Sequence, residues 1–278
     1  MLRPRPSTTL RPRKRFGQHF LEPAWIEKVI AAIDPQPDQT FIEIGPGRGA
    51  LTRPLAARAK AVIAFEIDRH LAAALRESAP PNVTLVEGDF LETADRLGHR
   101  QSMSGPLRVA GNLPYNVASP IMFTLVDLAR RGVPLVDATV MLQREVAERL
   151  AAPPGSRDYG VLSVLIGHRA SVRRVLTLPP GAFRPPPKVH SAVVSLRFHT
   201  PDPIVANEEL FAAIVQAVFT RRRKTLANAL LAFEGTQTGT QTVRRVLDIA
   251  AIDGRRRPET LAIAEFARLA DAFPAAAS

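Results

Sequence analysis

The sequence contains no cysteine, and this absence excludes disulfides, thiolate zinc sites and a cysteine nucleophile. Its six histidines are scattered without the spacing of metal ligands, so no metal site is predicted. The sequence also lacks any apolar run of about 18 residues, the length that a membrane helix needs. Proline and arginine interrupt the first 15 residues too often for the apolar region of a signal peptide. We therefore expect a cytoplasmic protein with no membrane segment.

Positive charge is what the chain has in excess. Lysine and arginine number 37 against 26 aspartates and glutamates, which gives a formal net charge of +11. Such an excess predicts a polyanionic partner, and nucleic acid is favoured over an anionic membrane surface. Residues 1–15 carry six positive charges and no negative one, so we interpret them as a basic flexible arm.

Short apolar runs rich in Val, Ile and Phe alternate with segments of helical length in the first 200 residues. This order predicts an α/β architecture with a mostly parallel sheet. After residues 201–203 the pattern is helical only, so we divide the chain into a domain over 16–200 and a small all-helical domain over 201–278. The predicted strands lie at 40–45, 61–67, 83–89, 107–112, 138–143 and 191–198, and the predicted helices at 24–33, 209–219, 224–233, 242–250 and 260–273.

A glycine-rich loop follows the first long strand, in the segment FIEIGPGRGALT. Gly45 and Gly47 have no side chains, so a ligand can approach the backbone amides and the helix that follows them. The same residues with Ala50 fit the dinucleotide pattern G-x-G-x-x-A, and Glu66 lies 21 residues past Gly45, where a ribose-binding acid is expected. The loop therefore predicts a nucleotide-type cofactor and does not choose among such cofactors.

The ends of the next two predicted strands make that choice. Asp89 ends the third strand and Asn112 the fourth, so four successive strands bring polar groups to the edge where open α/β sheets bind ligands. The segment Asn112-Leu113-Pro114-Tyr115 offers no acid or base for hydride chemistry. It suits methyl transfer to an exocyclic amine, because the Asn112 oxygen and a backbone carbonyl can accept the two N–H bonds of the amine. Pro114 would stiffen the turn and Tyr115 would stack on the base.

Seven motifs follow one another along the chain: FGQHFL at 16–21, EIGPGRGALT at 43–52, FEID at 65–68, GDF at 88–90, NLPY at 112–115, FRPPPKVHSAVV at 183–194 and RRRKT at 221–225. In this order they resemble the ribosomal RNA adenine dimethyltransferase family of KsgA type, over nearly the whole chain. The resemblance implies a class I, Rossmann-like methyltransferase domain that uses S-adenosylmethionine, with a small helical domain after it.

The family to which the resemblance points dimethylates two adjacent adenosines near the 3′ end of small-subunit 16S rRNA. The resemblance therefore implies the N6 amines of these adenosines as the substrate, a precursor of the 30S subunit as the partner, and a role in ribosome biogenesis. We expect the protein to act as a monomer.

The resemblance also implies roles for single residues. Glu66 would hold the ribose hydroxyls of the cofactor and Asp89 its adenine amine, and His19 stands where the family often has asparagine. Taken alone, Glu66 could be a solvated strand-end acid, His19 a loop histidine and Asp89 a helix N-cap. The expected cofactor contacts are His19, Leu21, Gly45, Gly47, Glu66, Asp89 and Asn112, and the expected catalytic residues are Asn112, Leu113, Pro114, Tyr115 and Phe183.

Two features keep two interpretations each. Phe183 either stacks near the adenine pocket, opposite Tyr115, or is a core aromatic residue before a proline-rich turn. Arg222, Arg223 and Lys224 either bind RNA or form a solvated face, and the net charge favours RNA.

Two alternative functions remain. One is an erythromycin-resistance type methylase of large-subunit rRNA, although such enzymes usually have Ile at the position of Leu113 and often Ser at that of Gly17. The other is a non-enzymatic ribosome-assembly or nucleic-acid binding factor with the same fold, against which Glu66, Asp89 and Asn112 argue.

Overall fold

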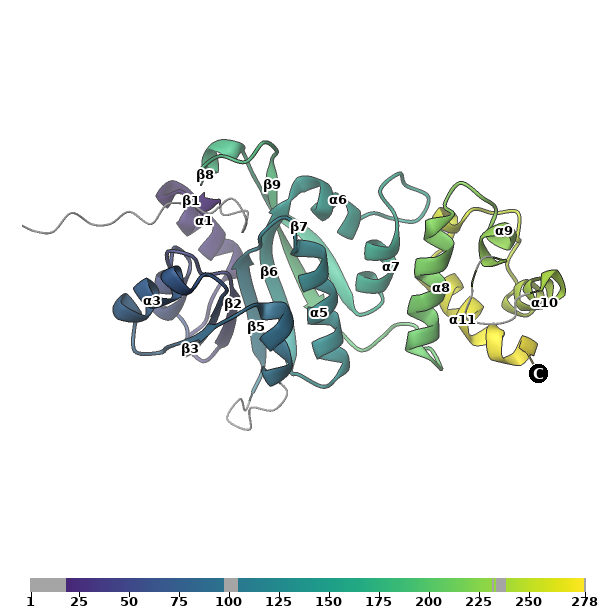
Figure 1. Cartoon of the computed structure of the whole chain (residues 1–278), viewed down its shortest axis with the longest axis horizontal. Coiled ribbons are helices and arrows are strands. Elements are labelled where there is room, and N and C mark those ends of the chain that lie inside the picture. Colours follow the sequence, from purple (N-terminus) through teal and green to yellow (C-terminus); the bar gives the residue numbers. More distant parts are fainter. Residues whose placement is uncertain (1–18, 98–104, 232, 234–238, 278) are drawn as a thin grey trace, which may run out of the picture.

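A computed structural model describes residues 19–97, 105–231, 233 and 239–277 of the chain, and Figure 1 shows how they are arranged. The basic arm predicted over 1–15 and the first three residues of the FGQHFL motif lie outside the described residues. Within the described segments, no helix is both long and apolar enough to cross a membrane.

Seven strands form one sheet in the order β4-β3-β2-β5-β6-β9-β7, and β1 pairs with β8 in a separate ribbon. Neighbours from β4 to β6 are parallel, whereas β9 is antiparallel to both β6 and β7. The predicted α/β architecture with a mostly parallel sheet is therefore confirmed. The strands are β1 (Phe20–Leu21), β2 (Thr40–Ile44), β3 (Ala61–Glu66), β4 (Val83–Glu87), β5 (Leu107–Asn112), β6 (Leu135–Gln143), β7 (Ala170–Leu178), β8 (Phe183–Arg184) and β9 (Ser191–Phe198).

Strand β7 is the long strand that the sequence pattern did not predict. It is one of the two edge strands of the sheet and carries Arg173 and Arg174, both exposed, in its middle. Its register against β9 also shifts between Arg174 and Leu176. Two adjacent charges and an irregularity interrupt the alternation by which a strand is recognised, and they blunt an edge that would otherwise pair with other chains.

Helices cover both faces of the sheet. Side chains alternate along β2, so Phe41 packs with α1 and α2 on one face, whereas Ile42 and Ile44 pack with α5 on the other. Burial on both faces explains why the central strands read as nearly continuous apolar runs. The helices of this part are α1 (Pro23–Ile33), α2 (Thr52–Ala56), α3 (Arg69–Ser78), α4 (Phe90–Thr93), α5 (Ala118–Arg130), α6 (Arg144–Leu150) and α7 (Val161–Gly167).

The chain after β9 forms helices, as predicted: α8 (Glu208–Thr220), α9 (Leu226–Leu230), α10 (Thr240–Ala250) and α11 (Ile263–Ala277). Figure 1 shows them gathered at one end of the molecule, beyond α7. Their apolar core also takes in Tyr159 and Val164, which come from the loop before α7 and from α7 itself. Arg169 and Glu208 form an ion pair across the connection between the two parts. The division of the chain at residue 200 stays a prediction.

Candidate active site

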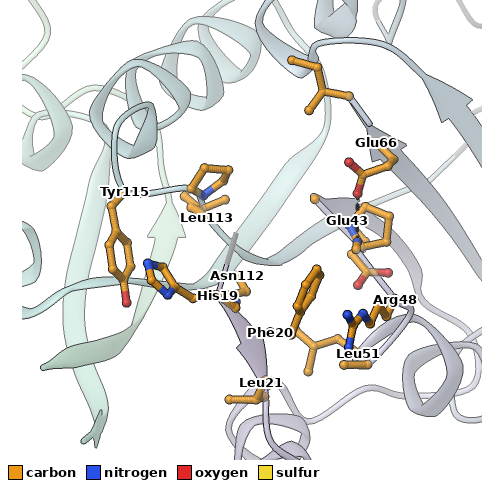
Figure 2. Close-up of a pocket in the computed structure, with 16 residues that line it drawn as sticks. His19, Phe20, Leu21, Glu43, Arg48, Leu51, Glu66, Asn112, Leu113 and Tyr115 are labelled. Carbon is orange, nitrogen blue, oxygen red and sulfur yellow. Dashed lines mark hydrogen bonds between the residues drawn. The ribbon is translucent and has the colours of Figure 1, made fainter. Parts of the chain in front are cut away.

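The carboxyl ends of four neighbouring strands form one edge of the sheet, as the sequence predicted. Because β4, β3, β2 and β5 are adjacent in that order, the residues at their ends come together: Asp89, Glu66, Gly45 and Asn112. A cavity of about 90 Å³ lies at this edge and is lined by Glu66, Gly45 and Asn112 together with residues of β1 and of the segment after β5. Figure 2 shows this cavity.

The glycine loop between β2 and α2 is shaped by positive φ angles. Gly45 has φ of +70° and Gly47 of +57°, a region in which side chains with a Cβ are strained. A Cβ on Gly47 would also lie only 3.2 Å from the ring of Phe20, which lines the cavity. The guanidinium of Arg48 lies over the Phe20 ring, 4.3 Å from its centre. Glycine at position 47 therefore allows β1 to close one side of the cavity.

Glu66 fixes this loop from the neighbouring strand. Its carboxylate accepts hydrogen bonds from the backbone N–H of Gly47 at 2.9 Å and from that of Asp68 at 2.8 Å. The residue is only 3% exposed, and burial raises its pKa although the amides of Asp68 and Gly47 act in the opposite direction. Glu66 is thus a buried, oriented acid that lines the cavity, rather than a solvated strand-end acid.

Glu43 is a second buried acid in the cavity, and the sequence analysis missed it. Strand alternation places it on the same face of the sheet as Glu66, and it is 1% exposed. Burial raises the pKa of Glu43 to about 8. The nearby hydroxyl of Thr52 lowers this pKa and the charge of Glu66 raises it further. Oε2 of Glu43 has no hydrogen-bond partner within the described part of the chain.

The signal that could have identified Glu43 was present in the sequence. An ionisable residue in the middle of a short apolar strand, FIEIG, is rarely buried unless it is paired or has a function.

The segment Asn112–Tyr115 leaves β5 as a fixed turn. The side-chain amide nitrogen of Asn112 donates to the backbone carbonyl of His19 at 2.7 Å, so its amide oxygen remains as the acceptor end. Leu113 is buried and its N–H donates to the carbonyl of Met141 at 3.0 Å. The carbonyl of Pro114 accepts from Val117 at 3.1 Å, just before α5 begins. These bonds hold the turn at the cavity that Asn112, Leu113 and Pro114 line.

Tyr115 lies in the wall of this cavity with one face of its ring covered by His19. The two rings are stacked with centres 5.4 Å apart, and Figure 2 shows His19 between Tyr115 and Asn112. The Tyr115 hydroxyl shares a hydrogen bond of 2.5 Å with Oγ of Ser191, and burial raises its pKa. Nδ1 of His19 donates to the carbonyl of Pro185 at 2.7 Å. His19 is therefore a structural partner of Tyr115 as well as a residue of the cavity wall.

Asp89 has two roles in the structure. Its side chain accepts a hydrogen bond of 2.9 Å from the N–H of Leu91 and so caps the N-terminus of α4, which was one of the two interpretations. It also lines a second cavity of about 80 Å³ that shares Gly45, Ile67 and Pro114 with the first. Capping uses only part of the carboxylate, so both interpretations are compatible with this position.

Phe183 is not brought to the cavity. It is 1% exposed and packs in the apolar core under α1, and in the ribbon it pairs with Leu21. The ring therefore does not lie opposite Tyr115 here, and the interpretation as a core aromatic residue describes its position. Leu21 is also buried, but unlike Phe183 it lines the cavity.

The basic residues after α8 differ from one another. Arg222 is half-buried and donates to the carbonyl of Ser156 at 3.1 Å, whereas Arg223 and Lys224 are exposed. Arg222 therefore contributes to the packing of the helical part against the loop before α7. Among all the described residues, no group of three or more His, Asp or Glu side chains is placed to hold a metal ion.

Comparison with known proteins gives one consistent result. A family model described as ribosomal RNA adenine dimethylase matches residues 9–269. The chain is 40% identical over 260 residues to ribosomal RNA small subunit methyltransferase A of Leptothrix cholodnii, covering 93% of this chain and 90% of that protein. It is 42% identical to the protein of the same name from Acinetobacter baylyi, with 93% and 91% covered.

Two solved structures share the fold. A dimethyladenosine transferase from Plasmodium falciparum aligns with a TM-score of 0.73 at 24% identity, over 90% of this chain and 96% of that one. The 23S rRNA methyltransferase ErmE aligns with a TM-score of 0.64 at 29% identity, over 92% and 99%. The predicted Rossmann-like methyltransferase fold with a helical C-terminal part is thereby confirmed.

Proposed function

The chain belongs to the ribosomal RNA adenine dimethylase family, and from this premise we propose that it methylates the N6 amines of two adjacent adenosines near the 3′ end of 16S rRNA. The observation that carries the choice of the small subunit is the likeness to small subunit methyltransferases A at 40 to 42% identity over about nine tenths of both chains. The substrate that we propose is the rRNA within a precursor of the 30S subunit, which places the reaction in the cytoplasm. We further propose that the enzyme acts as a monomer.

The residues of the cavity fit S-adenosylmethionine as the cofactor. This molecule carries a sulfonium and an ammonium group, and the cavity presents two buried acids, Glu43 and Glu66. Glu66 has unused lone pairs on both carboxylate oxygens after accepting its two backbone bonds, so it can also accept from ribose hydroxyls. Asp89 in the adjoining cavity is suited to the adenine amine, and Ile67 offers an exposed apolar surface to the ring.

When bound, the cofactor supplies an electrophilic methyl group with a good leaving group, so the protein needs to position the amine rather than activate it strongly. The amide oxygen of Asn112 accepts one N–H of the target amine, and a carbonyl of the turn accepts the other. This arrangement directs the nitrogen lone pair toward the methyl group and stabilises the positive charge that develops. The methylated nitrogen then loses its extra proton to solvent water, so a dedicated general base is not required.

Tyr115 offers the target base the ring face that His19 leaves uncovered. Its hydroxyl is held by Ser191 and its ring by His19, so the ring orientation is set before the substrate arrives. A base taken out of its RNA stack gains about 1–3 kcal/mol from stacking on such a ring. The exposed Arg223 and Lys224 and the overall charge of +11 support binding to the RNA backbone.

A large-subunit substrate is the alternative that a specific observation favours, namely the likeness to the 23S rRNA methyltransferase ErmE at 29% identity. Primer extension on 16S and 23S rRNA, after incubation of unmethylated ribosomal particles with the protein and labelled cofactor, separates the two. We expect stops at two adjacent adenosines near the 3′ end of 16S rRNA and none in 23S rRNA. Stops only in 23S rRNA would support the alternative, and binding without stops would support a non-enzymatic assembly factor.

A further inference from the structure

The loop between β8 and β9 is fastened at both ends to the rings of His19 and Tyr115. At its start the carbonyl of Pro185 accepts a hydrogen bond from His19, and directly after its end Ser191 bonds the Tyr115 hydroxyl. We call residues 185–190 the entrance loop. Because the two rings stack on each other in the cavity wall, the loop is held beside the wall at which we propose that the target base stacks.

The outer surface of the entrance loop is cationic and apolar. Pro187 is buried and anchors its middle, whereas Lys188, Val189 and His190 are exposed in succession, with Val189 at 45%. The segment from residue 183 to residue 198 contains no aspartate or glutamate. Three consecutive prolines at 185–187 restrict the backbone, so binding to this surface sacrifices little conformational entropy.

We propose that the entrance loop binds the RNA strand next to the target adenosine, with Lys188 on a phosphate and Val189 packed against a neighbouring base. The inference rests on the proposed function, because it needs an RNA whose adenosine leaves its stack at Tyr115. Proteins that unstack nucleic acid bases insert apolar side chains as wedges between base steps, and they bind the phosphates with lysine and arginine. The entrance loop presents this combination on consecutive residues.

The position of the loop favours RNA over the cofactor as its ligand. The cofactor residues Glu43 and Glu66 line the cavity beyond Asn112, and Figure 2 shows His19 standing between Asn112 and Tyr115. The loop is bonded to His19 and, through Ser191, to Tyr115, whereas none of its own residues lines the cavity. Substitutions of Lys188 and Val189 are therefore expected to leave cofactor affinity unchanged, and calorimetry with S-adenosylmethionine checks this.

The charge is tested with Lys188→Ala against the matched control Lys60→Ala. Lys60 is also exposed but precedes β3, at the opposite edge of the sheet. Binding of a 16S rRNA 3′-end fragment is measured by fluorescence anisotropy over a series of salt concentrations. We expect Lys188→Ala to bind about three- to tenfold more weakly at low salt and to reduce the slope of the salt dependence by about 1. Lys60→Ala should keep the parent slope.

The apolar contact is tested with Val189→Ala against Val136→Ala, which truncates another exposed valine near the amino end of β6. Single-turnover methylation at saturating RNA should slow by about fivefold for Val189→Ala, because the wedge stabilises the unstacked substrate. Val189→Leu, which keeps an apolar side chain, should retain the parent rate, as should Val136→Ala.

The outcomes separate the two proposals. A parent salt slope for Lys188→Ala overturns the phosphate contact, and a parent rate for Val189→Ala overturns the wedge. If the parent protein methylates no 16S rRNA, the proposed function fails, whereas the salt series still decides whether the entrance loop contacts RNA.

Discussion

Replacing Glu43 by glutamine should make the protein more stable and less able to bind its cofactor. The carboxyl has a pKa of about 8 in the folded chain against an ordinary value of 4.5, so at pH 7 it must stay protonated on folding while the unfolded chain ionises. Ionisation at pH 7 stabilises the unfolded chain by about 1.4 kcal/mol for each of the 2.5 pH units between its pKa of 4.5 and pH 7. The free energy of unfolding of the parent is therefore lower by about 3 kcal/mol. Glutamine is neutral in both states and removes this loss.

The sign of the effect gives a test by pH. Because the folded pKa is raised, the parent loses stability as pH rises from about 4.5 to about 8, and glutamine at position 43 should not. The gain from Glu43→Gln should therefore be less than about 1 kcal/mol at pH 5 and about 3 kcal/mol at pH 7, where it corresponds to a rise in Tm of roughly 6–12 °C. Differential scanning calorimetry measures both, with Glu87→Gln, an exposed acid that ends β4, as the control.

The same substitution should weaken S-adenosylmethionine. A cationic ligand favours the ionised form of Glu43, so the parent should release a proton on binding below about pH 8, and the glutamine variant should release fewer. Titration calorimetry in buffers of different ionisation enthalpy counts these protons. A variant whose stability differs from that of the parent by the same amount at pH 5 and pH 7 would refute the reasoning. So would a variant that keeps the parent affinity and proton release.

Three further predictions concern the remaining site residues. Glu66→Ala should weaken S-adenosylmethionine binding by about 2–3 kcal/mol in calorimetry, because charged hydrogen bonds are lost. An unchanged affinity would contradict the assignment of Glu66 to the ribose hydroxyls. Asn112→Ala should lower the single-turnover methylation rate by about a hundredfold with RNA binding unaltered, and a parent rate would reduce Asn112 to a turn residue. The double variant Arg223→Gln, Lys224→Gln should reduce the slope of the salt dependence of RNA binding, and a parent slope would mean that both residues belong to a solvated face. Arg222→Gln should chiefly lower Tm, because Arg222 donates to the carbonyl of Ser156.

The edge of the sheet was predictable because its information is local. Apolar runs of strand length mark β2, β3, β4 and β5, and the first polar residue or glycine after each run identifies the end at which parallel strands meet. The helical C-terminal part was predictable for the same reason, since periodicity is read over neighbouring residues. The helix expected over 224–233 is shorter in the structure, where α9 spans only Leu226–Leu230.

Other properties of the site depend on contacts between distant residues. The protonation of Glu43 follows from complete burial, which only the assembled sheet and helices provide. The ring of Tyr115 meets His19 across 96 residues of chain, and Phe183 turns inward because the ribbon of β1 and β8 places it beneath α1. No pattern in a short window distinguishes a buried phenylalanine from one that faces a cavity.

The pairing of β1 with β8 has a consequence for how the chain folds during its synthesis. Phe20 lies opposite Arg184, so more than half of the chain must emerge from the ribosome before the wall that carries His19 and Phe20 finds its partner strand. Two-residue strands hold little stability of their own, and a contact between such distant residues forms late. A nascent chain can therefore fold β2 to β5 early and still lack a closed cavity, which delays cofactor capture until synthesis of the sheet is nearly complete.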